Sequence, residues 1–475
     1  MNLGIAFRGL KLFFKIAIIF YVLLGCCFIA TIIGVRYFYG NIDIALMLQH
    51  IQLIKTADLS VFQGAICLGV GVTIFTTLLI LRWRIIGIPI LTVALGYLII
   101  PEIDFTFFIT QNDSIYQKYY IIPKLKAPKK PKNIIWISLE SIEELFADSK
   151  TTRTESLIPN LKELQKYGTN FQGWNHVHLY MEPTLPSYVA TNCGIPRKIR
   201  LNSQFRNSVQ SIPSAICMSD LLKKNGYDTT FIMGGHIEDE NANQFVGAHP
   251  YTTVMGRDDF IQQKYSTSQQ KITGSNDITP DSVVFQYAKD KLNQLAKSDK
   301  PFFMSIITAN THGPSFKFLE QNCEKKYNDA RDNIKCFDKT VFDFVSWVQK
   351  QHFYKDTIIF LIGDHYIFSH NISKMKFFDS KVKSRVIETF NVVLDGSNTE
   401  PQVIHKKFTQ IDWAPTMLES AGFKLKPRRL GLGVSLWSNE KTLLERFYSI
   451  ENLKEKLKES EPFIDDFFMN DIENS

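Results

Sequence analysis

Hydrophobic and polar positions are distributed unevenly along the chain, and the longest apolar runs all lie near the N-terminus. Uncharged runs at residues 16–35 and 59–81 are long enough to cross a bilayer as helices, and a shorter run covers residues 85–100. Basic residues lie before the first run and between the last two, which by the positive-inside rule predicts a cytoplasmic N-terminus. We therefore predict a membrane anchor of about three helices in residues 1–101, with the rest of the chain outside the cytoplasm.

Residues 102–132 connect this anchor to the remainder of the chain. An aromatic and polar stretch suited to the headgroup region of a bilayer is followed by a run rich in lysine and proline, which is typical of a stiff basic linker. At the other end, residues 439–475 are acidic and helix-prone, and we predict a solvated helical tail there.

Between the linker and the tail, residues 133–438 alternate continuous apolar runs with stretches of helical periodicity. The apolar runs predict strands at residues 133–139, 229–233, 302–308, 357–362 and 386–393. The periodic stretches predict helices at residues 158–167, 216–224, 282–296, 330–349 and 409–420. Because buried parallel strands read as continuous apolar runs, this alternation predicts an α/β domain with a largely parallel central sheet covered by helices.

Charge and cysteine content narrow the function classes. The formal net charge of +7 is modest for 475 residues and both signs are interspersed, so we expect no nucleic-acid partner. Four of the seven cysteines lie after the predicted anchor: Cys193, Cys217, Cys323 and Cys336. None has the CxxC spacing of zinc or thioredoxin-like centres. If this part of the chain lies outside the cytoplasm, we favour two disulfides, Cys193 with Cys217 and Cys323 with Cys336; four buried thiols are the alternative.

Polar groups directly follow two of the predicted strands. Glu140 follows residues 133–139, and Asp364 and His365 follow residues 357–362 after one glycine. Ligands in parallel α/β folds collect at the carboxyl ends of the strands, where two carboxylates and an imidazole could hold one divalent cation. Taken alone, Glu140 also fits a carboxylate at a helix N-terminus. Adjacent acidic and imidazole groups after an apolar strand have little structural reason to be there.

The segment MEPTLPSYVATNCGIP, residues 181–196, supplies a third element. Thr184 lies just before a helix-compatible stretch, so its hydroxyl could point from a helix N-terminus into the cation site. A cation lowers the pKa of a hydroxyl and a helix N-terminus favours a phosphate anion, which are the two effects that a threonine nucleophile needs. The alternative for Thr184 is an N-cap residue without a reaction.

Together these motifs resemble the alkaline phosphatase and sulfatase superfamily, and within it the lipoteichoic acid synthases and the phosphoglycerol transferases of osmoregulated periplasmic glucans. The segments that carry the resemblance are NIIWISLES (133–141), the threonine segment (181–196), CMSDLLKKNGYDTTFIMGG (217–235), PFFMSIITANTHGP (301–314), KCFDKTVFDFVSWVQKQHFYKDTIIFLIGDH (335–365) and QIDWAPTMLESAG (410–422). They cover most of residues 133–438 in the order of the family. The resemblance therefore implies a sulfatase-like catalytic domain outside the cytoplasm.

A cation site and a reaction follow from this resemblance. It implies that Glu140, Asp364 and His365 bind one divalent cation, Mn²⁺ or Mg²⁺, together with Thr184. It also implies that Thr184 attacks the head-group phosphate of a lipid. His312 falls where the relatives keep a histidine that faces the substrate, either to protonate the leaving oxygen or to hold a phosphate oxygen. The alternative for His312 is a loop histidine hydrogen-bonded to backbone.

Cys193 and Cys336, with the Cys-Gly-Ile-Pro stretch after the threonine, resemble the periplasmic glucan branch. That branch implies transfer of a phosphoglycerol group from phosphatidylglycerol to a periplasmic glucan or another cell-envelope acceptor, through a covalent phosphothreonine intermediate. It also implies a multi-pass protein of the bacterial inner membrane with its catalytic domain in the periplasm.

The loop GGHIEDENANQF, residues 234–245, departs from the lipoteichoic acid enzymes, which keep substrate-contacting His, Trp and Arg residues there. His236 is a candidate replacement, and an ordinary surface histidine is the alternative. Other functions remain open: transfer of phosphoethanolamine to lipid A or a surface glycan, hydrolysis by a sulfatase-like site, and binding without catalysis. The stretch TLPSY (184–188) lacks the Cys-x-Pro-x-Arg pattern that sulfatase maturation needs, which counts against hydrolysis.

Overall fold

The structure is a computed structural model that describes residues 114–460 with several gaps. The gaps are residues 153–154, 175–183, 197–211, 266–277, 313–322, 328, 368–387 and 399. The predicted membrane anchor and the first part of the predicted interfacial segment lie outside the described residues, as do residues 461–475. Among the helices that the structure describes, none is both long and apolar enough to cross a membrane.

An eight-stranded sheet forms the centre of the described domain, with the strand order β5-β4-β6-β2-β7-β8-β3-β9. Its strands are β2 (Asn133–Leu139), β3 (Thr169–Trp174), β4 (Asp228–Met233), β5 (Thr253–Met255), β6 (Phe302–Ile307), β7 (Thr357–Gly363), β8 (Asn391–Asp395) and β9 (Gln402–Phe408). Neighbouring strands are parallel except where β8 pairs with β7 and with β3. The prediction of a largely parallel sheet is therefore confirmed.

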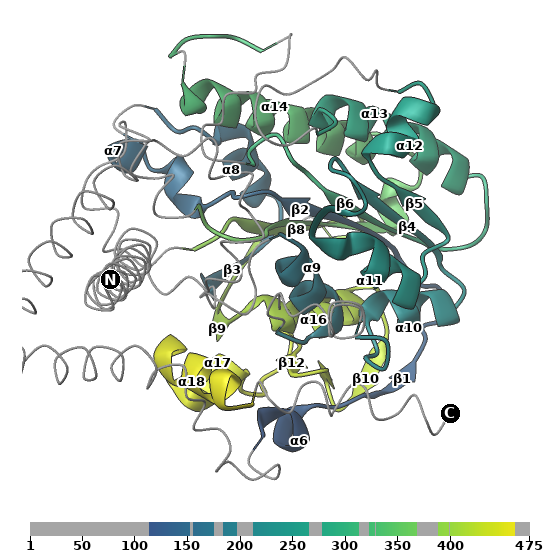
Figure 1. The fold of residues 1–475 in the computed structure, drawn as a ribbon, viewed down its shortest axis with the longest axis vertical. Helices are drawn as coiled ribbons and strands as arrows, with labels where there is room; N and C mark the ends of the chain where they lie inside the picture. The colour runs from purple at the N-terminus through teal and green to yellow at the C-terminus, as the bar shows by residue number, and fades with distance from the viewer. Residues whose placement is uncertain are drawn as a thin grey trace, which may run out of the picture. The chain divides into compact units, whose positions relative to one another are not determined.

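Helices cover both faces of the sheet (Figure 1). On one face lie α8 (Pro159–Gln165), α13 (Asp281–Leu295) and α14 (Ala330–Gln349). On the other face lie α9 (Thr184–Cys193), α10 (Met218–Lys224) and α16 (Trp413–Ser420). Side chains alternate along β2 accordingly, since Ile135 and Ile137 join the core of the first face and Ile134 and Trp136 that of the second. Burial on both faces explains the continuous apolar sequence of this strand.

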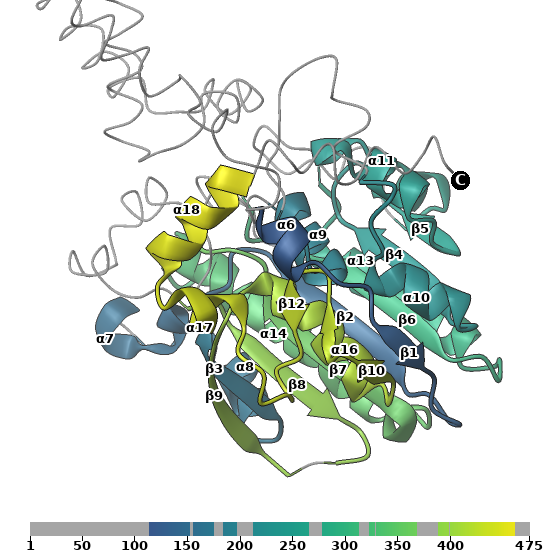
Figure 2. The ribbon, with the colours of Figure 1, turned by 90° about the horizontal axis from the view of Figure 1, so that it is seen from below.

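Shorter elements complete the domain. They are α6 (Ile115–Tyr119), α7 (Ser149–Thr152), α11 (Ala242–Ala248), α12 (Arg257–Gln262), α17 (Leu443–Phe447), α18 (Ile450–Ser460), the 3₁₀ turns Glu144–Ala147, Asp239–Asn241, Tyr354–Asp356 and Gln410–Asp412, and the ribbon of β11 (Arg429–Leu430) with β12 (Gly433–Val434). Strand β1 (Lys124–Lys126) pairs with β10 (Lys424–Lys426), and the two lie side by side in Figure 2. Part of the stretch expected to be a linker thus belongs to the folded domain, because its backbone pairs with β10.

The predicted strands that the structure reproduces within one residue at each end are β2, β4, β6 and β7. The strand predicted at residues 386–393 is wrong in its limits, because its described part becomes a strand only at Asn391 and ends at Asp395. Strands β3 and β9 were not predicted because neither has a continuous apolar run. Strand β9 lies at the edge of the sheet, where most of its side chains are exposed.

Candidate active site

The pairing of β2 with β7 brings the candidate cation ligands together. In this parallel pair Leu139 lies opposite Gly363, so the next residues, Glu140 and Asp364, leave the sheet at the same edge. The backbone N–H of Asp364 donates to Leu139 O at 3.1 Å and extends the pairing by one residue. Glu140, Asp364 and His365 are buried, and their candidate ligand atoms lie within 4.8 Å of one another.

Thr184 is the first residue of α9, and its Oγ1 donates to Glu140 Oε2 at 2.9 Å. The hydroxyl therefore reaches the cluster from the helix N-terminus. About one turn further along the helix, Ser187 Oγ donates to the backbone carbonyl of Asp364 at 2.6 Å. Gln410 Nε2 donates to the same carbonyl at 3.1 Å. The first bond holds α9, and the second holds the 3₁₀ turn Gln410–Asp412, against the strand end that carries Asp364.

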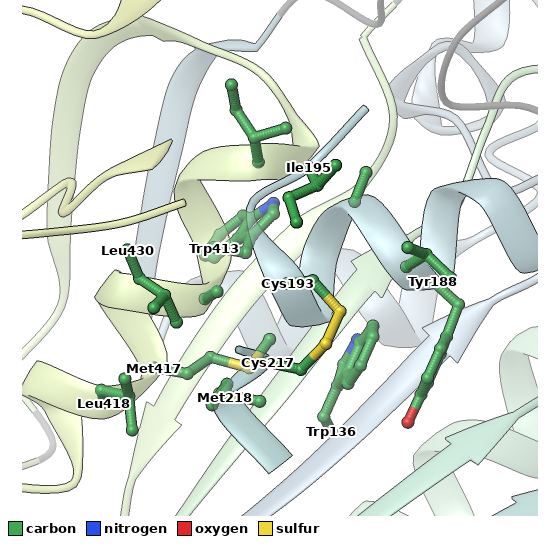
Figure 3. Close-up of a cluster of buried hydrophobic side chains, with 14 of the residues drawn as sticks. Trp136, Tyr188, Cys193, Ile195, Cys217, Met218, Trp413, Met417, Leu418 and Leu430 are labelled. Carbon is green, nitrogen blue, oxygen red and sulfur yellow. A yellow bond between two sulfur atoms is a disulfide. The ribbon is translucent and has the colours of Figure 1, made fainter. Parts of the chain in front are cut away.

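Buried contacts also anchor α9 along its length (Figure 3). Tyr188 stacks on Trp136 of β2, with ring centroids 4.5 Å apart. At the C-terminal end of α9, a disulfide joins Cys193 to Cys217, the residue before α10. The helix that begins with Thr184 is therefore tied to the sheet at one side and to α10 at its far end.

Burial and neighbouring charges act on the two carboxylates in opposite directions. Burial alone would raise the pKa of Glu140, but the nearby imidazoles of His365 and His312 and the hydrogen bonds from Ser141 and Thr184 together hold that pKa below its ordinary value. Burial and the negative charge of Glu140 raise the pKa of Asp364 well above its usual range. A divalent cation beside both groups would favour the charged form of each.

The hydrogen bonds of Asp364 test whether the cluster fits a cation. Its Oδ1 accepts from the backbone N–H groups of Ser141 at 2.8 Å and His365 at 2.6 Å. Its Oδ2 is buried and has no hydrogen-bond partner among the residues that the structure describes. A buried carboxylate oxygen without a donor is costly unless a cation faces it. Two carboxylates, an imidazole and a hydroxyl suit Mn²⁺ or Mg²⁺, so the residues present fit one divalent cation.

His365 is oriented by its other ring nitrogen. Its Nδ1 donates to Tyr366 O at 2.9 Å, which leaves Nε2 to face the carboxylates. Nε2 lies 3.5 Å from Glu140 Oε1 and 3.6 Å from Asp364 Oδ2. We call the four residues of this cluster the metal side of the site: Glu140, Thr184, Asp364 and His365.

His312 lies in the turn that follows β6. Its backbone N–H donates to Ala309 O at 2.9 Å, and the preceding Thr311 Oγ1 donates to Glu140 O at 2.6 Å. The charge of His312 acts on both Glu140 and Asp239, and it opposes the effect of burial on the pKa of each. The structure therefore places His312 next to the metal side.

His236 lies in the loop after β4, against acidic residues rather than in the cluster around Glu140. Its backbone N–H donates to Asp239 Oδ2 at 3.0 Å, and its Nδ1 lies 3.3 Å from Asp258 Oδ2. Glu238 lies near the same ring, so these side chains make a small, mostly exposed acidic group.

Glu240 belongs to the same loop, and the sequence did not single it out. Its Oε2 accepts from the backbone N–H of Leu185, the second residue of α9, at 2.7 Å. The backbone is left-handed at Glu240, with φ 52°, and at Asn241, with φ 63°, and such conformations of non-glycine residues cluster at functional sites. Burial raises the pKa of Glu240 to about 7. We call His236, Glu240 and His312 the head-group side, after the substrate contacts that the sequence leads us to expect of His236 and His312.

A second disulfide joins Cys323 to Cys336, which is the other pairing that the sequence favours. Cys336 lies in α14, so the bond ties this helix to the chain that precedes it. Disulfides are typical of compartments outside the reducing cytoplasm.

Comparison with known proteins adds family information. A profile of the sulfatase family matches residues 132–423. Phosphoglycerol transferase I of Salmonella typhi is 25% identical over 365 residues, which covers 74% of this chain and 45% of that protein. The chain thus spans about half the length of this relative.

Solved structures share the fold. The lipoteichoic acid synthase LtaP from Listeria monocytogenes has a TM-score of 0.56 at 14% identity, covering 75% of this chain and 97% of that one. A protein of the alkaline phosphatase superfamily from Vibrio parahaemolyticus has a TM-score of 0.51 at 23% identity, covering 66% of this chain and 71% of that one. These likenesses confirm the sulfatase-like α/β architecture.

Proposed function

Because the chain belongs to the sulfatase family, we propose that it is a metal-dependent phosphotransferase with Thr184 as its nucleophile. The observation that carries this proposal is the hydrogen bond from Thr184 Oγ1 to Glu140 Oε2 at the start of α9. Asp364 Oδ2, which lacks a partner among the described residues, supports a cation in the same cluster. A sulfatase needs a cysteine or serine for maturation, so a threonine here favours phosphotransfer over sulfate-ester hydrolysis.

Phosphatidylglycerol is the donor that we propose, and a periplasmic glucan or another glycan of the cell envelope is the acceptor. The name of the Salmonella relative, phosphoglycerol transferase I, supports this assignment. The anchor predicted in residues 1–101 would keep the site within reach of a lipid donor. The two disulfides support a catalytic domain in the periplasm, at the inner membrane of a bacterium.

In the first half-reaction, Thr184 Oγ1 attacks the phosphorus of the donor and the bond from phosphorus to the diacylglycerol oxygen breaks. The hydroxyl proton of Thr184 passes to Glu140 Oε2, which accepts its hydrogen bond, and His312 protonates the leaving oxygen. The start of α9 favours negative charge beside Thr184 because of its backbone N–H groups. Glu140, Thr184, Asp364 and His365 would hold a divalent cation, which would offset charge on the phosphate oxygens and favour the ionised hydroxyl.

In the second half-reaction, a hydroxyl of the acceptor attacks the phosphodiester formed on Thr184. His312 takes the proton of that hydroxyl, which reverses its first role. The bond from phosphorus to Thr184 breaks, the threonine oxygen takes its proton back from Glu140, and the phosphoglycerol group remains on the acceptor.

Transfer of phosphoethanolamine is a second candidate, and the acidity of the loop after β4 favours it. Glu238, Asp239 and Glu240 follow one another there, and Asp258 lies beside His236. Carboxylates attract an ammonium group, whereas the glycerol of phosphatidylglycerol is neutral. The choice of donor therefore separates the two candidates.

The test uses the full chain in detergent with Mn²⁺ and fluorescent phosphatidylglycerol or phosphatidylethanolamine. We expect diacylglycerol release from phosphatidylglycerol and a glycerophosphate mass on the tryptic peptide that contains Thr184. Thr184→Ala should abolish both, whereas Thr191→Ala, about two turns further along α9, should retain them. Turnover of phosphatidylethanolamine alone would favour the second candidate. No diacylglycerol from either lipid would contradict the proposal.

A further inference from the structure

A buried carboxylate, Asp281, accepts hydrogen bonds from the turn that carries His312. Asp281, the first residue of α13, is fully buried; its Oδ1 accepts from the N–H of Ala309 at 2.8 Å and its Oδ2 from the N–H of Asn310 at 3.0 Å. In return, Asn310 Oδ1 accepts from the backbone N–H of Asp281 at 3.0 Å. The start of α13 is thus joined reciprocally to the turn.

A second helix holds the same turn. Asn333, in the first turn of α14 and also buried, donates from Nδ2 to Asn310 O at 2.8 Å. The backbone N–H, the backbone oxygen and the side chain of Asn310 are therefore all engaged by α13 and α14. The N–H of His312 closes the turn on Ala309 O at 2.9 Å. The position of His312 follows from these contacts.

On its other side the turn meets the metal side. Thr311 Oγ1 donates to Glu140 O at 2.6 Å, and Thr308 Oγ1 accepts from the N–H of Glu140 at 3.0 Å. Glu140 directly follows Leu139, whose pairing with Gly363 of β7 does not involve the turn. A displaced turn would therefore change the place of His312 relative to Thr184 more than it would change the cation ligands.

We propose that Asp281 is the positioning residue of His312, an inference that rests on the proposed phosphotransfer. Both of its oxygens accept from residues far along the chain, 28 and 29 positions away. A carboxylate that served only to start α13 would have no need of these bonds. By holding two adjacent N–H groups, Asp281 keeps the imidazole of His312 in one orientation toward the leaving oxygen.

Asp281→Asn tests this role because the amide keeps the size of the carboxylate but has a single acceptor oxygen, so one N–H of the turn loses its bond. We expect kcat for transfer to fall about 10-fold to 30-fold and KM to stay within about 2-fold, since a small misplacement of a catalytic group is costly in rate. Asp290→Asn, at an exposed position of the same helix, is the matched control and should leave kcat unchanged.

A double-mutant cycle decides whether the effect passes through His312. In a His312→Ala background, Asp281→Asn should lower kcat less than about 2-fold, because the group that it positions is absent. A loss of the same size in both backgrounds would overturn the inference. Thermal unfolding checks that the variants fold. If Asp281→Asn does not fold, Asn333→Ala, which removes one donor to the turn, takes its place in the same cycle.

A readout without turnover keeps this inference separate from the proposed function. In heteronuclear spectra of the histidine-labelled chain, the imidazole resonance that disappears in His312→Ala should shift in Asp281→Asn and not in Asp290→Asn. If the resonance shifts while the wild type transfers no phosphoglycerol, the proposed function fails and the positioning stands. If the resonance does not move in Asp281→Asn, the positioning itself is refuted.

Discussion

Glu140 and Asp364 leave neighbouring strands, whereas His236 and Glu240 lie in a loop, so the metal side and the head-group side are built by different means. The register of β2 on β7 is set by seven paired residues, and the separation of the two carboxylates follows from it. The loop depends on side-chain hydrogen bonds and on left-handed backbone at non-glycine residues. Sheet register tolerates few changes, but loops vary readily. We therefore propose that the residues at the strand ends, together with His312, carry the reaction, and that the loop of His236 and Glu240 acts on the choice of head group.

The two sides also differ in how the oxygens of their carboxylates are satisfied. Asp364 has one oxygen without a hydrogen-bond partner among the described residues, which calls for a cation. Glu240 instead accepts from the N–H of Leu185, at the helix end that would otherwise favour a phosphate anion. We therefore expect Asp364 to attract a cation and Glu240 to act on an anion that approaches Thr184.

Asp364→Asn should have the largest effect because it removes a proposed cation ligand. We expect transfer to fall at least about 1,000-fold and Mn²⁺ to lose its stabilising effect on thermal unfolding. Without added metal the variant should unfold no earlier than the wild type, because burial and the charge of Glu140 already disfavour the charged form of Asp364. Calorimetric titration and thermal unfolding with and without Mn²⁺ check this. If Mn²⁺ stabilised the variant against thermal unfolding as much as it stabilises the wild type, the cation site would be contradicted.

His312→Ala breaks the head-group side and leaves the cation ligands in place. We expect about 100-fold to 1,000-fold slower transfer, because general acid–base catalysis is lost, with unchanged Mn²⁺ affinity. If His312 protonates the leaving oxygen, the substitution should slow transfer far less from a donor whose leaving group is p-nitrophenolate, because that group leaves without a proton. The exposed His352→Ala is the control. A drop in Mn²⁺ affinity as large as that of Asp364→Asn would show that the two sides are not separate.

Glu240→Gln should have a smaller effect, on anion binding rather than on rate. The variant keeps an acceptor for Leu185 but loses a negative charge, so dimethyl phosphate should inhibit transfer about 3-fold to 10-fold more strongly. With a pKa of about 7, Glu240 is neutral below that pH and charged above it. Inhibition of the wild type should therefore weaken as pH rises through about 7, while that of the variant should not. Parallel pH profiles of inhibition would contradict a role for this carboxylate.

The sequence predicts most of the sheet and the helices because their signals are local. Strand β2 is buried on both faces and reads as a continuous apolar run, and the predicted helix at residues 330–349 matches α14. The same reasoning puts Glu140 and Asp364 at one edge, since the ends of neighbouring parallel strands meet there. It fails for β9, because an exposed edge strand lacks that run.

The contribution of Glu240 could not be predicted for a different reason. Its hydrogen bond to Leu185 joins residues 55 positions apart, and the loop reaches α9 through left-handed backbone at two non-glycine residues. Neither property leaves a periodic pattern in the sequence. Acidic residues after a Gly-Gly strand end are the one local signal, and they equally suit a solvated loop. The hydrogen bonds of Asp281 to the turn of His312 could not be predicted for the same reason, because they join residues 28 and 29 positions apart.

The smallest expected effect concerns Asp338, a buried carboxylate of α14 that belongs to neither side. Its burial shows that a buried carboxylate is not by itself a functional site. Asp338 lies in α14 and accepts from the backbone N–H groups of Asn160 and Leu161 at 3.0 and 2.8 Å, at the start of α8. Burial outweighs these donors and raises its pKa to about 6. The prediction concerns stability and not transfer, because among the described residues the hydrogen-bond donors to Asp338 lie at the start of α8.

Asp338→Asn should flatten part of the pH dependence of unfolding. Between the ordinary pKa of 3.8 and about 6, the folded chain holds the Asp338 proton more tightly than the unfolded chain, so stability from this group falls as pH rises through that window. The variant removes that fall, and near pH 7 its free energy of unfolding should lie within about 1 kcal/mol of the wild type, because a lost hydrogen bond offsets a removed buried charge. Thermal unfolding across the window measures this, with the exposed Asp343→Asn of the same helix as control. A variant with the pH slope of the wild type would show that the Asp338 carboxyl titrates alike in the folded and unfolded chain.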